Sequence, residues 1–216
     1  MKRLLKKEFK LTSLKLTYYF ILFSLMSFIP GYPILLGAFF LTLGIFQSFE
    51  NARLQNDTLF SLLLPVTKKD IVVSKYCYVM IVEAIFFLFC ALITAFRMTV
   101  LKDAEIYKAN AMMNANLAYL AYILIILALF NSIFLGGFFK TAYYVGKPFL
   151  LYGAASFIVV LVAEVIHHIP GLEMLNSQSK GLGMQAIVLA LGIVVYIALT
   201  LCSMKTSIKT FERIDI

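Results

Sequence analysis

Apolar residues fill six long stretches of this chain, and short polar segments or Pro/Gly turns separate them. The stretches cover residues 16–29, 34–49, 76–96, 117–139, 149–166 and 185–204. An α-helix rises about 1.5 Å per residue, so roughly 17 to 25 apolar residues cross a hydrocarbon core about 30 Å thick. The pattern predicts an all-α polytopic membrane protein with six transmembrane helices, forming one domain over residues 1–216.

Composition supports this class and excludes a water-soluble globule. Hydrophobic residues make up 62% of the chain and charged residues only 14%, which leaves too little polar surface to cover a soluble protein of this size. The net charge of +8 could suggest nucleic-acid binding, but the lysines gather at the ends of apolar stretches. We therefore expect membrane lipids, and no nucleic acid, as partners.

The distribution of Lys and Arg predicts the orientation in the membrane. Fifteen lie before the first stretch, after the second and fourth stretches, and in the C-terminal tail. The other four are Arg97, Lys102, Lys108 and Lys180, on the opposite face. Short loops rich in Lys and Arg stay in the cytoplasm. Both termini and the connection over residues 50–75 are therefore predicted to be cytoplasmic.

Residues 1–15 form a basic segment with helical periodicity. One side of a helix carries Leu4, Leu5, Phe9 and Leu11, whereas the other carries the lysines and Arg3, with Glu8 as the exception. This pattern is typical of a helix that lies in the membrane interface with its apolar side toward lipid. An ordinary charged flank that orients the first span remains an equal alternative.

The connection over residues 50–75 contains two helix start signals. Asn56 or Asp57 can cap a short Leu-rich helix, which Pro65 ends. Thr67 and Asp70 then form a capping box ahead of a helix that enters the third stretch. This connection carries an apolar patch flanked by Lys68, Lys69 and Asp70, and the patch consists of Leu59, Phe60, Leu62, Leu63 and Leu64. An apolar patch rimmed by charge at the water face indicates a docking surface. The alternative is that its leucines rest on lipid or on neighbouring helices.

The segment from Ser61 to Tyr76, SLLLPVTKKDIVVSKY, resembles the one between the second and third spans of small six-helix ABC transporter permeases of the type 2 export family. The resemblance implies a permease half whose cytoplasmic coupling helix docks on a separate ABC ATPase. The residues that it assigns to ATPase coupling are Asp57, Phe60, Leu62, Leu63, Pro65, Thr67, Lys68, Lys69 and Asp70.

The chain lacks a phosphate-binding loop of its own. Its single Gly-Lys pair, Gly146-Lys147, is followed by Pro148 and has no glycine five residues before it, as the motif requires. We therefore expect no enzyme activity and no cofactor in this chain, with ATP and Mg²⁺ bound by the partner ATPase. The resemblance also implies a second permease half, identical or different, and a bacterial plasma membrane.

Three polar residues inside the apolar stretches are candidates for a substrate path. These are Glu83, Asn131 and Glu164. A charge at mid-bilayer costs on the order of 2.5 to 3.5 kcal/mol, so a carboxylate there is protonated, paired or faces a polar cavity. For Glu83 the alternative is a structural hydrogen bond, for example to Asn131. Glu164 with His167 and His168 favours a hydrogen-bonded cluster over a metal site, because no second Glu-x-x-His pair exists.

The function that these patterns favour is the membrane subunit of an ATP-driven exporter. Abundant Phe and Tyr with few fixed charges suit a hydrophobic or amphipathic substrate, and the resemblance suggests an antimicrobial or cytolytic peptide. One alternative is a membrane scaffold or regulator that recruits a cytoplasmic protein through residues 50–75. Another is an ion-coupled transporter that uses Glu83.

Overall fold

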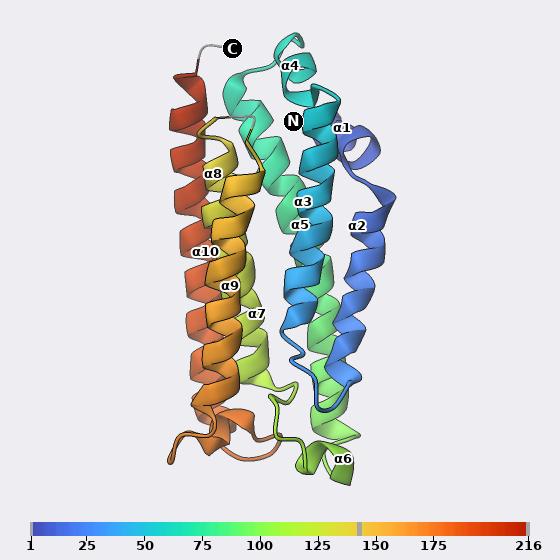
Figure 1. The fold of residues 1–216 in the computed structure, drawn as a ribbon, viewed down its shortest axis with the longest axis vertical. Coiled ribbons are helices and arrows are strands. Elements are labelled where there is room, and N and C mark those ends of the chain that lie inside the picture. The colour runs from blue at the N-terminus through green and yellow to red at the C-terminus, as the bar shows by residue number, and fades with distance from the viewer. Residues whose placement is uncertain (1, 142–143, 215–216) are drawn as a thin grey trace.

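Long helices run side by side along the molecule in the computed structural model, which describes residues 2–141 and 144–214 (Figure 1). In chain order they are α1 (Lys2–Lys7), the π-helix η1 (Glu8–Thr12), α2 (Lys15–Phe20), the 3₁₀-helix η2 (Ile21–Phe28), α3 (Leu36–Leu54), α4 (Asp57–Leu62), α5 (Lys68–Thr99), α6 (Glu105–Lys108), α7 (Leu117–Leu129), the π-helix η3 (Phe130–Leu135), α8 (Gly136–Phe138), α9 (Gly146–Ile166), the 3₁₀-helix η4 (Glu173–Asn176) and α10 (Leu182–Glu212). The prediction of an all-α fold is confirmed for these residues, which contain no strand.

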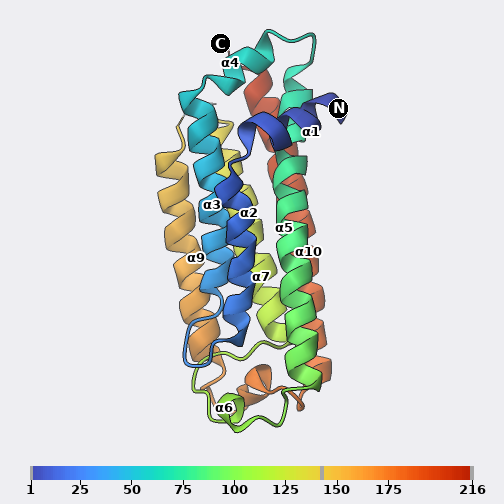
Figure 2. The ribbon, with the colours of Figure 1, turned by 90° about the vertical axis from the view of Figure 1, so that its right-hand side faces the viewer.

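Four helical segments of the described chain are long and apolar enough to cross a membrane: α5, α7 to α8, α9 and α10. The number rises to five if the bent pair of helices Lys2–Thr12 and Lys15–Phe28 is counted as one span. The second predicted span corresponds to α3, which lies lengthwise beside α2 and α9 (Figure 2). Because α3 ends in Glu50, Asn51 and Arg53, it is less apolar, and a count of six stays a prediction.

The first predicted span is short, and its backbone is stretched. Only Lys15–Phe20 is α-helical, and the next eight residues form the 3₁₀-helix η2. A 3₁₀-helix rises about 2.0 Å per residue, so η2 gains about 4 Å over an α-helix of the same length. The predicted turn follows, with Gly31 at φ 69°, a value that favours glycine.

The N-terminal helix Lys2–Thr12 is bent by 90° from Lys15–Phe28. This is the orientation of a helix that lies across the end of the bundle (Figure 2). Its apolar side packs against protein, however, because Leu4 is 5% exposed and the Phe9 ring meets Tyr78 edge-on with centroids 5.2 Å apart. Leu4 and Phe9 therefore face protein and not lipid as predicted, whereas Leu11, which was predicted on the same side, is 62% exposed.

The centre of the bundle is α7, which is largely buried, whereas α9 and α10 expose most of their apolar side chains. Close approach of α10 to α7 depends on Gly192, where an added Cβ would lie 3.0 Å from the Ala121 backbone. The apolar outer surface of α9 and α10 suits contact with lipid or with another membrane segment.

The two ends of the bundle differ in content. At one end lie α1, α4 and the C-terminal end of α10, and at the other lie α6 and the connection between α9 and α10 (Figures 1 and 2). The charge distribution predicts that the first end is cytoplasmic and the second is outside. The first end is called the α4 end below.

Candidate coupling site

The helix α4 begins and ends near the residues that the sequence predicts. Asn56 occupies the N-cap position in the left-handed conformation, with φ 53° and ψ 32°, but its side chain makes no capping hydrogen bond. The prediction that Asn56 or Asp57 caps α4 through its side chain is wrong, because Asp57 turns toward lysines instead. The helix ends at Leu62, three residues before Pro65.

The capping box at the start of α5 is confirmed. The Thr67 hydroxyl accepts a hydrogen bond from the Asp70 backbone N–H at 3.1 Å, and the Asp70 carboxylate accepts from the Thr67 N–H at 3.2 Å. Hydrogen bonds from the Thr67 hydroxyl and backbone lower the pKa of Asp70 below its ordinary value. The box fixes where α5 starts, and so fixes the length of the connection to α4.

One side of α4 is apolar and open to its surroundings. Leu59 is 49% exposed, Phe60 53% and Leu63, just after the helix, 85%. Leu62 instead packs against the core of the bundle. Of the three large apolar side chains that the resemblance assigns to ATPase coupling, Phe60 and Leu63 are therefore available to a partner, while Leu62 attaches α4 to the core of the bundle. Leu59, Phe60 and Leu63 are called the α4 patch.

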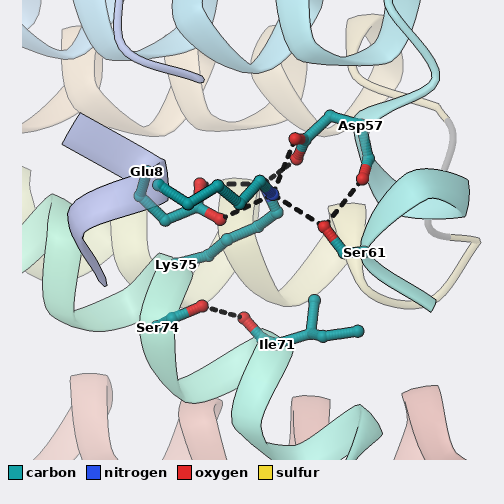
Figure 3. Close-up of polar contacts among 7 residues, drawn as sticks. Glu8, Asp57, Ser61, Ile71, Ser74 and Lys75 are labelled. Atoms are coloured by element: carbon teal, nitrogen blue, oxygen red, sulfur yellow. Dashed lines mark hydrogen bonds and ion pairs between the residues drawn. The ribbon is translucent and has the colours of Figure 1, made fainter. Parts of the chain in front are cut away.

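Behind α4 lies a buried cluster of two lysines and two carboxylates (Figure 3). The Lys75 ammonium is 3.1 Å from a Glu8 carboxylate oxygen and 3.0 Å from an Asp57 oxygen. The Lys7 ammonium is 3.2 Å from the second Glu8 oxygen and contacts the second Asp57 oxygen at 2.6 Å. Both cations bridge both anions. Lys7, Glu8, Asp57 and Lys75 are called the ion cluster.

The ion cluster is electrically balanced and nearly closed to water. The side chains of Glu8 and Lys75 are each 1% exposed, and those of Lys7 and Asp57 are 9% and 10% exposed. Burial alone raises the pKa of Asp57, but the charges of Lys75 and Lys7 and the hydrogen bonds that they donate bring it below its ordinary value. Asp57 is thus held as a carboxylate.

The ion cluster joins segments far apart in the sequence. Glu8 belongs to η1, Asp57 to α4 and Lys75 to α5. Lys7 also donates to the Ser61 hydroxyl at 2.6 Å, and this hydroxyl donates to the Asp57 carbonyl at 2.7 Å. Buried ion pairs with these satisfied hydrogen bonds fix relative position rather than add much net stability. The N-terminal helix, α4 and the first turns of α5 are therefore held together as one unit.

A pH dependence follows from Asp57. A carboxyl whose folded pKa is lowered contributes stability that is present above its unfolded pKa and is lost as the pH falls through the folded pKa. We expect thermal stability in detergent to fall on acidification below the ordinary range of Asp, and to fall less in Asp57→Asn. Asp103→Asn serves as the control, because its ion pair with Lys108 is exposed. Equal acid sensitivity of all three proteins would contradict the assignment.

The other predicted coupling residues lie near α4 but differ in role. Lys68 donates to the carbonyl oxygen of Ile214 at 2.6 Å, so it ties α5 to the C-terminal segment. Lys69 and Pro65 are exposed. Lys68 therefore serves a contact within the chain, whereas Lys69 is exposed in the first turn of α5.

A second buried polar cluster lies midway along the bundle. The Asn131 amide donates to a Glu83 carboxylate oxygen at 2.9 Å, and the Tyr196 hydroxyl donates to the same oxygen at 2.7 Å. The amide also donates to the Thr200 hydroxyl at 3.2 Å. The structural hydrogen bond between Glu83 and Asn131 is thus confirmed. Among the described residues, the second Glu83 oxygen and the Asn131 side-chain oxygen have no hydrogen-bond partner.

Asn131 lies in the π-helix η3, whose wider turn changes the backbone bonding of the helix. Its carbonyl oxygen accepts from the Ser203 hydroxyl at 2.8 Å. Ser203 and Ser207 share hydrogen bonds with the Tyr76 hydroxyl at 2.8 and 2.9 Å. The polar side chains of α10 therefore compensate the irregular backbone of η3 inside an apolar bundle.

Residues 3–212 match the model of a protein family described as ABC-2 family transporter protein. The chain belongs to the ABC-2 transporter family. The match covers nearly every helix described above, from α1 to the end of α10. Comparison with curated proteins and with solved structures gave no match. The family and the apolar helices together identify a multi-pass membrane protein of a transporter family.

In this ABC-2 family protein, Glu164 is not part of the Glu83 cluster. It lies near the end of α9, where its carboxylate accepts from the Met113 backbone N–H at 2.8 Å. The His167 ring contacts the carbonyl oxygens of Ala163 and Ala111 at 3.2 and 3.3 Å. Glu164 and His167 thus bond to backbone groups, not to each other, and the His168 ring lies against the His167 ring with centroids 4.2 Å apart. The bonds to Met113 and Ala111 fasten α9 to the loop before α7. Residues 2–141 and 144–214 contain no group of three or more metal ligands.

The sequence did not identify several members of these clusters. Lys7, Glu8 and Lys75 looked like parts of charged flanks, yet they hold Asp57. A signal was present in Glu8, the acidic exception in a basic amphipathic segment. No comparable signal marked Tyr196 as a partner of Glu83.

Proposed function

We propose that this ABC-2 family protein is the permease subunit of an ATP-driven exporter, and that α4 is its coupling helix. A separate cytoplasmic ABC ATPase binds ATP and Mg²⁺ and docks on the α4 patch. The six apolar segments, including α2 to η2 and α3, cross the membrane, and both termini lie in the cytoplasm. A second permease half, identical or different, completes the path for the substrate.

The observation that carries this proposal is the attachment of α4 to the ion cluster. A coupling element has to pass a displacement from a soluble partner to membrane helices, so it must not move independently of them. Asp57 in the first turn of α4 contacts Lys75 in α5, and Ser61 one turn later contacts Lys7. A push on the exposed patch therefore acts directly on α5 and on the N-terminal helix.

The patch also has the character expected of a docking surface. Leu59, Phe60 and Leu63 are exposed at the α4 end of the bundle. In protein interfaces, a few aromatic or aliphatic side chains that become buried on binding contribute most of the binding energy. Lys69, exposed in the first turn of α5, supplies a charge that steers association. The substrate that fits the apolar surface of α9 and α10 is hydrophobic or amphipathic, such as a membrane-active peptide.

Purification with partners tests this function. The tagged full-length chain is extracted from its native membrane with mild detergent, and co-purifying proteins are identified. An ABC ATPase in an assembly with two permease halves, whose ATP hydrolysis changes when amphipathic peptide is added, is the expected result. A non-ATPase partner on the α4 patch would instead favour the scaffold or regulator, and would overturn the exporter.

A second candidate, ion-coupled transport, has one observation in its favour. Glu83 is buried among helices and one of its oxygens has no partner among the described residues, so a proton or small cation could complete its bonding. Because Gln retains an acceptor for Asn131 and Tyr196, we expect Glu83→Gln to keep stability within about 1 kcal/mol and to retain ATP-driven transport.

The measurement is transport into inverted vesicles, with and without ATP and with and without a proton gradient, together with thermal unfolding. Glu83→Ala is the comparison variant, because it leaves two buried donors unsatisfied and should cost about 1 to 3 kcal/mol. Loss of transport in Glu83→Gln, with unchanged stability and with a dependence on the gradient in the parent protein, would favour the ion-coupled transporter.

A further inference from the structure

A polar hollow of about 380 Å³ lies at the end of the bundle opposite α4. Its walls come from the connection between α5 and α7, from the end of α9, and from the connection between α9 and α10. These segments lie at the same end of the bundle as α6 (Figures 1 and 2). The charge distribution predicts that this end is outside, and the cavity is called the outer hollow.

Hydrogen bonds between the loops shape the outer hollow. The Asn114 N–H donates to the Asn176 side-chain oxygen at 2.6 Å, and the Asn176 amide donates to the Met112 carbonyl at 3.2 Å. Deeper, the Asn116 amide donates to the Leu175 carbonyl at 2.8 Å. Most loop surfaces have no such cross-links, so the walls are preorganised for a ligand.

Three of the four Lys and Arg residues of this end lie at or directly behind the outer hollow. Outward loops of a membrane protein contain few Lys and Arg, yet Lys102 and Lys108 both line the cavity. Arg97 lies behind it: its guanidinium donates to the Asn114 side-chain oxygen at 2.9 Å and lies 3.7 Å from the centre of the Tyr107 ring. Asn114 and Tyr107 are themselves lining residues.

Arg97 is 1% exposed, and within residues 2–141 and 144–214 no carboxylate forms an ion pair with it. A buried cation without a nearby anion makes the local potential positive, because little water screens it. This potential acts on a hollow whose wall residues Asn114 and Tyr107 are in direct contact with the guanidinium.

Two lysines and one carboxylate are among the side chains that line the hollow. Lys102 forms no ion pair within the described chain, while Lys108 is paired with Asp103 at 3.2 Å. Glu173 is the one carboxylate that the described lining contains. An anionic acceptor supplied by a ligand would therefore give Lys102 an ion-pair partner.

We propose that the outer hollow binds the carboxylate of a short acidic peptide segment from the outside. Lys102 pairs with the carboxylate, and the positive potential of the buried Arg97 behind Asn114 and Tyr107 favours it. Of the described lining residues only Ala111 lacks a polar side-chain group, which disfavours a lipid tail, and Glu173 disfavours a doubly charged phosphate. This binding site does not depend on ATP-driven export; it depends on the orientation of the chain.

Binding of a defined probe to the full-length chain in nanodiscs tests the proposal. The probe is Gly-Asp-Gly with a fluorescent label on its N-terminus and a blocked C-terminus, so that it carries one carboxylate. It is compared with the same peptide carrying Asn in place of Asp (the amide probe), and inorganic phosphate is added as a competitor. We expect Lys102→Gln to weaken binding of the acidic probe roughly tenfold, because a charge-assisted hydrogen bond is lost. Glu173→Gln should strengthen it about two- to threefold, because a like charge is removed.

Lys180→Gln is the matched control. Lys180 is exposed at the same end of the protein and is not among the lining residues, so its loss should change affinity by less than about twofold. Equal weakening in Lys102→Gln and Lys180→Gln would mean general attraction to surface charge and would overturn the site. Equal binding of the amide probe, or displacement by phosphate at lower concentration than by the acidic peptide, would overturn the carboxylate assignment.

Discussion

Replacing Lys75 with Met is expected to destabilise the protein by about 3 to 5 kcal/mol, the largest folding effect of any single change at the α4 end. Lys75 is 1% exposed and bridges Glu8 and Asp57. Without it, two buried carboxylates remain with the single charge of Lys7, and they repel each other in a medium that screens poorly. Thermal unfolding in detergent, followed by circular dichroism, measures the loss.

Two further variants separate the ion cluster from a general effect of removing a lysine. Lys69→Met removes an exposed lysine from the same helix and should leave stability nearly unchanged. Adding Glu8→Gln to Lys75→Met removes one of the repelling carboxylates, so we expect part of the lost stability to return. If the double variant were less stable than Lys75→Met by the full cost of Glu8→Gln alone, the two residues would not be coupled.

The ion cluster also affects function in a way that stability alone does not. Because it attaches α4 to α5 and to the N-terminal helix, weakening it should let α4 move without the membrane helices. At a low temperature at which the Lys75→Met protein is still folded, it should still bind the ATPase, but the amount of substrate transported per ATP hydrolysed should fall. A parallel fall of docking and transport would indicate instead that α4 has lost its shape.

Local signals in the sequence predicted the start of α5 and the end of α4, but the predicted side-chain cap of α4 was wrong. The capping box of Thr67 and Asp70 is correct because both residues lie within one helical turn and need no other part of the chain. Pro65 likewise limits α4 through its own backbone geometry. The hydrogen bond between Glu83 and Asn131 was also predictable, because a buried carboxylate in an apolar helix requires a polar neighbour and few exist.

The remaining features depend on contacts between distant segments. The partners of Lys75 lie 67 and 18 residues away in sequence, and no periodicity within one helix relates them. The 3₁₀-helix η2 and the π-helix η3 are likewise responses to neighbouring helices, since the propensities of their residues do not distinguish them from α-helix. In α4, a helix of six residues, periodicity could not decide that Leu62 faces inward while Phe60 faces outward.

Because Leu62 faces the bundle while Phe60 and Leu63 face outward, substitutions of the outward-facing residues should have the second large effect, which is on binding of the ATPase. Leu63 is 85% exposed, so Leu63→Glu should leave folding intact, yet it puts a charge into the centre of the proposed interface. We expect ATPase affinity to fall roughly 30-fold or more, which corresponds to about 2 kcal/mol at a central anchor. Phe60→Ala should have a similar effect by removing an aromatic anchor without adding charge.

The measurements are the affinity of the purified ATPase for the permease in nanodiscs and the ATP hydrolysis that permease stimulates. Ile106→Glu is the matched control, because Ile106 is 60% exposed on α6 at the opposite end of the bundle, beyond the reach of a partner on the α4 patch. A soluble partner bound through α4 must discriminate between these two charged substitutions, since both have the same chemistry and differ only in place. If Leu63→Glu and Ile106→Glu bound the ATPase equally well, the α4 patch would not be the docking surface, and the force on α5 would have to enter the bundle elsewhere.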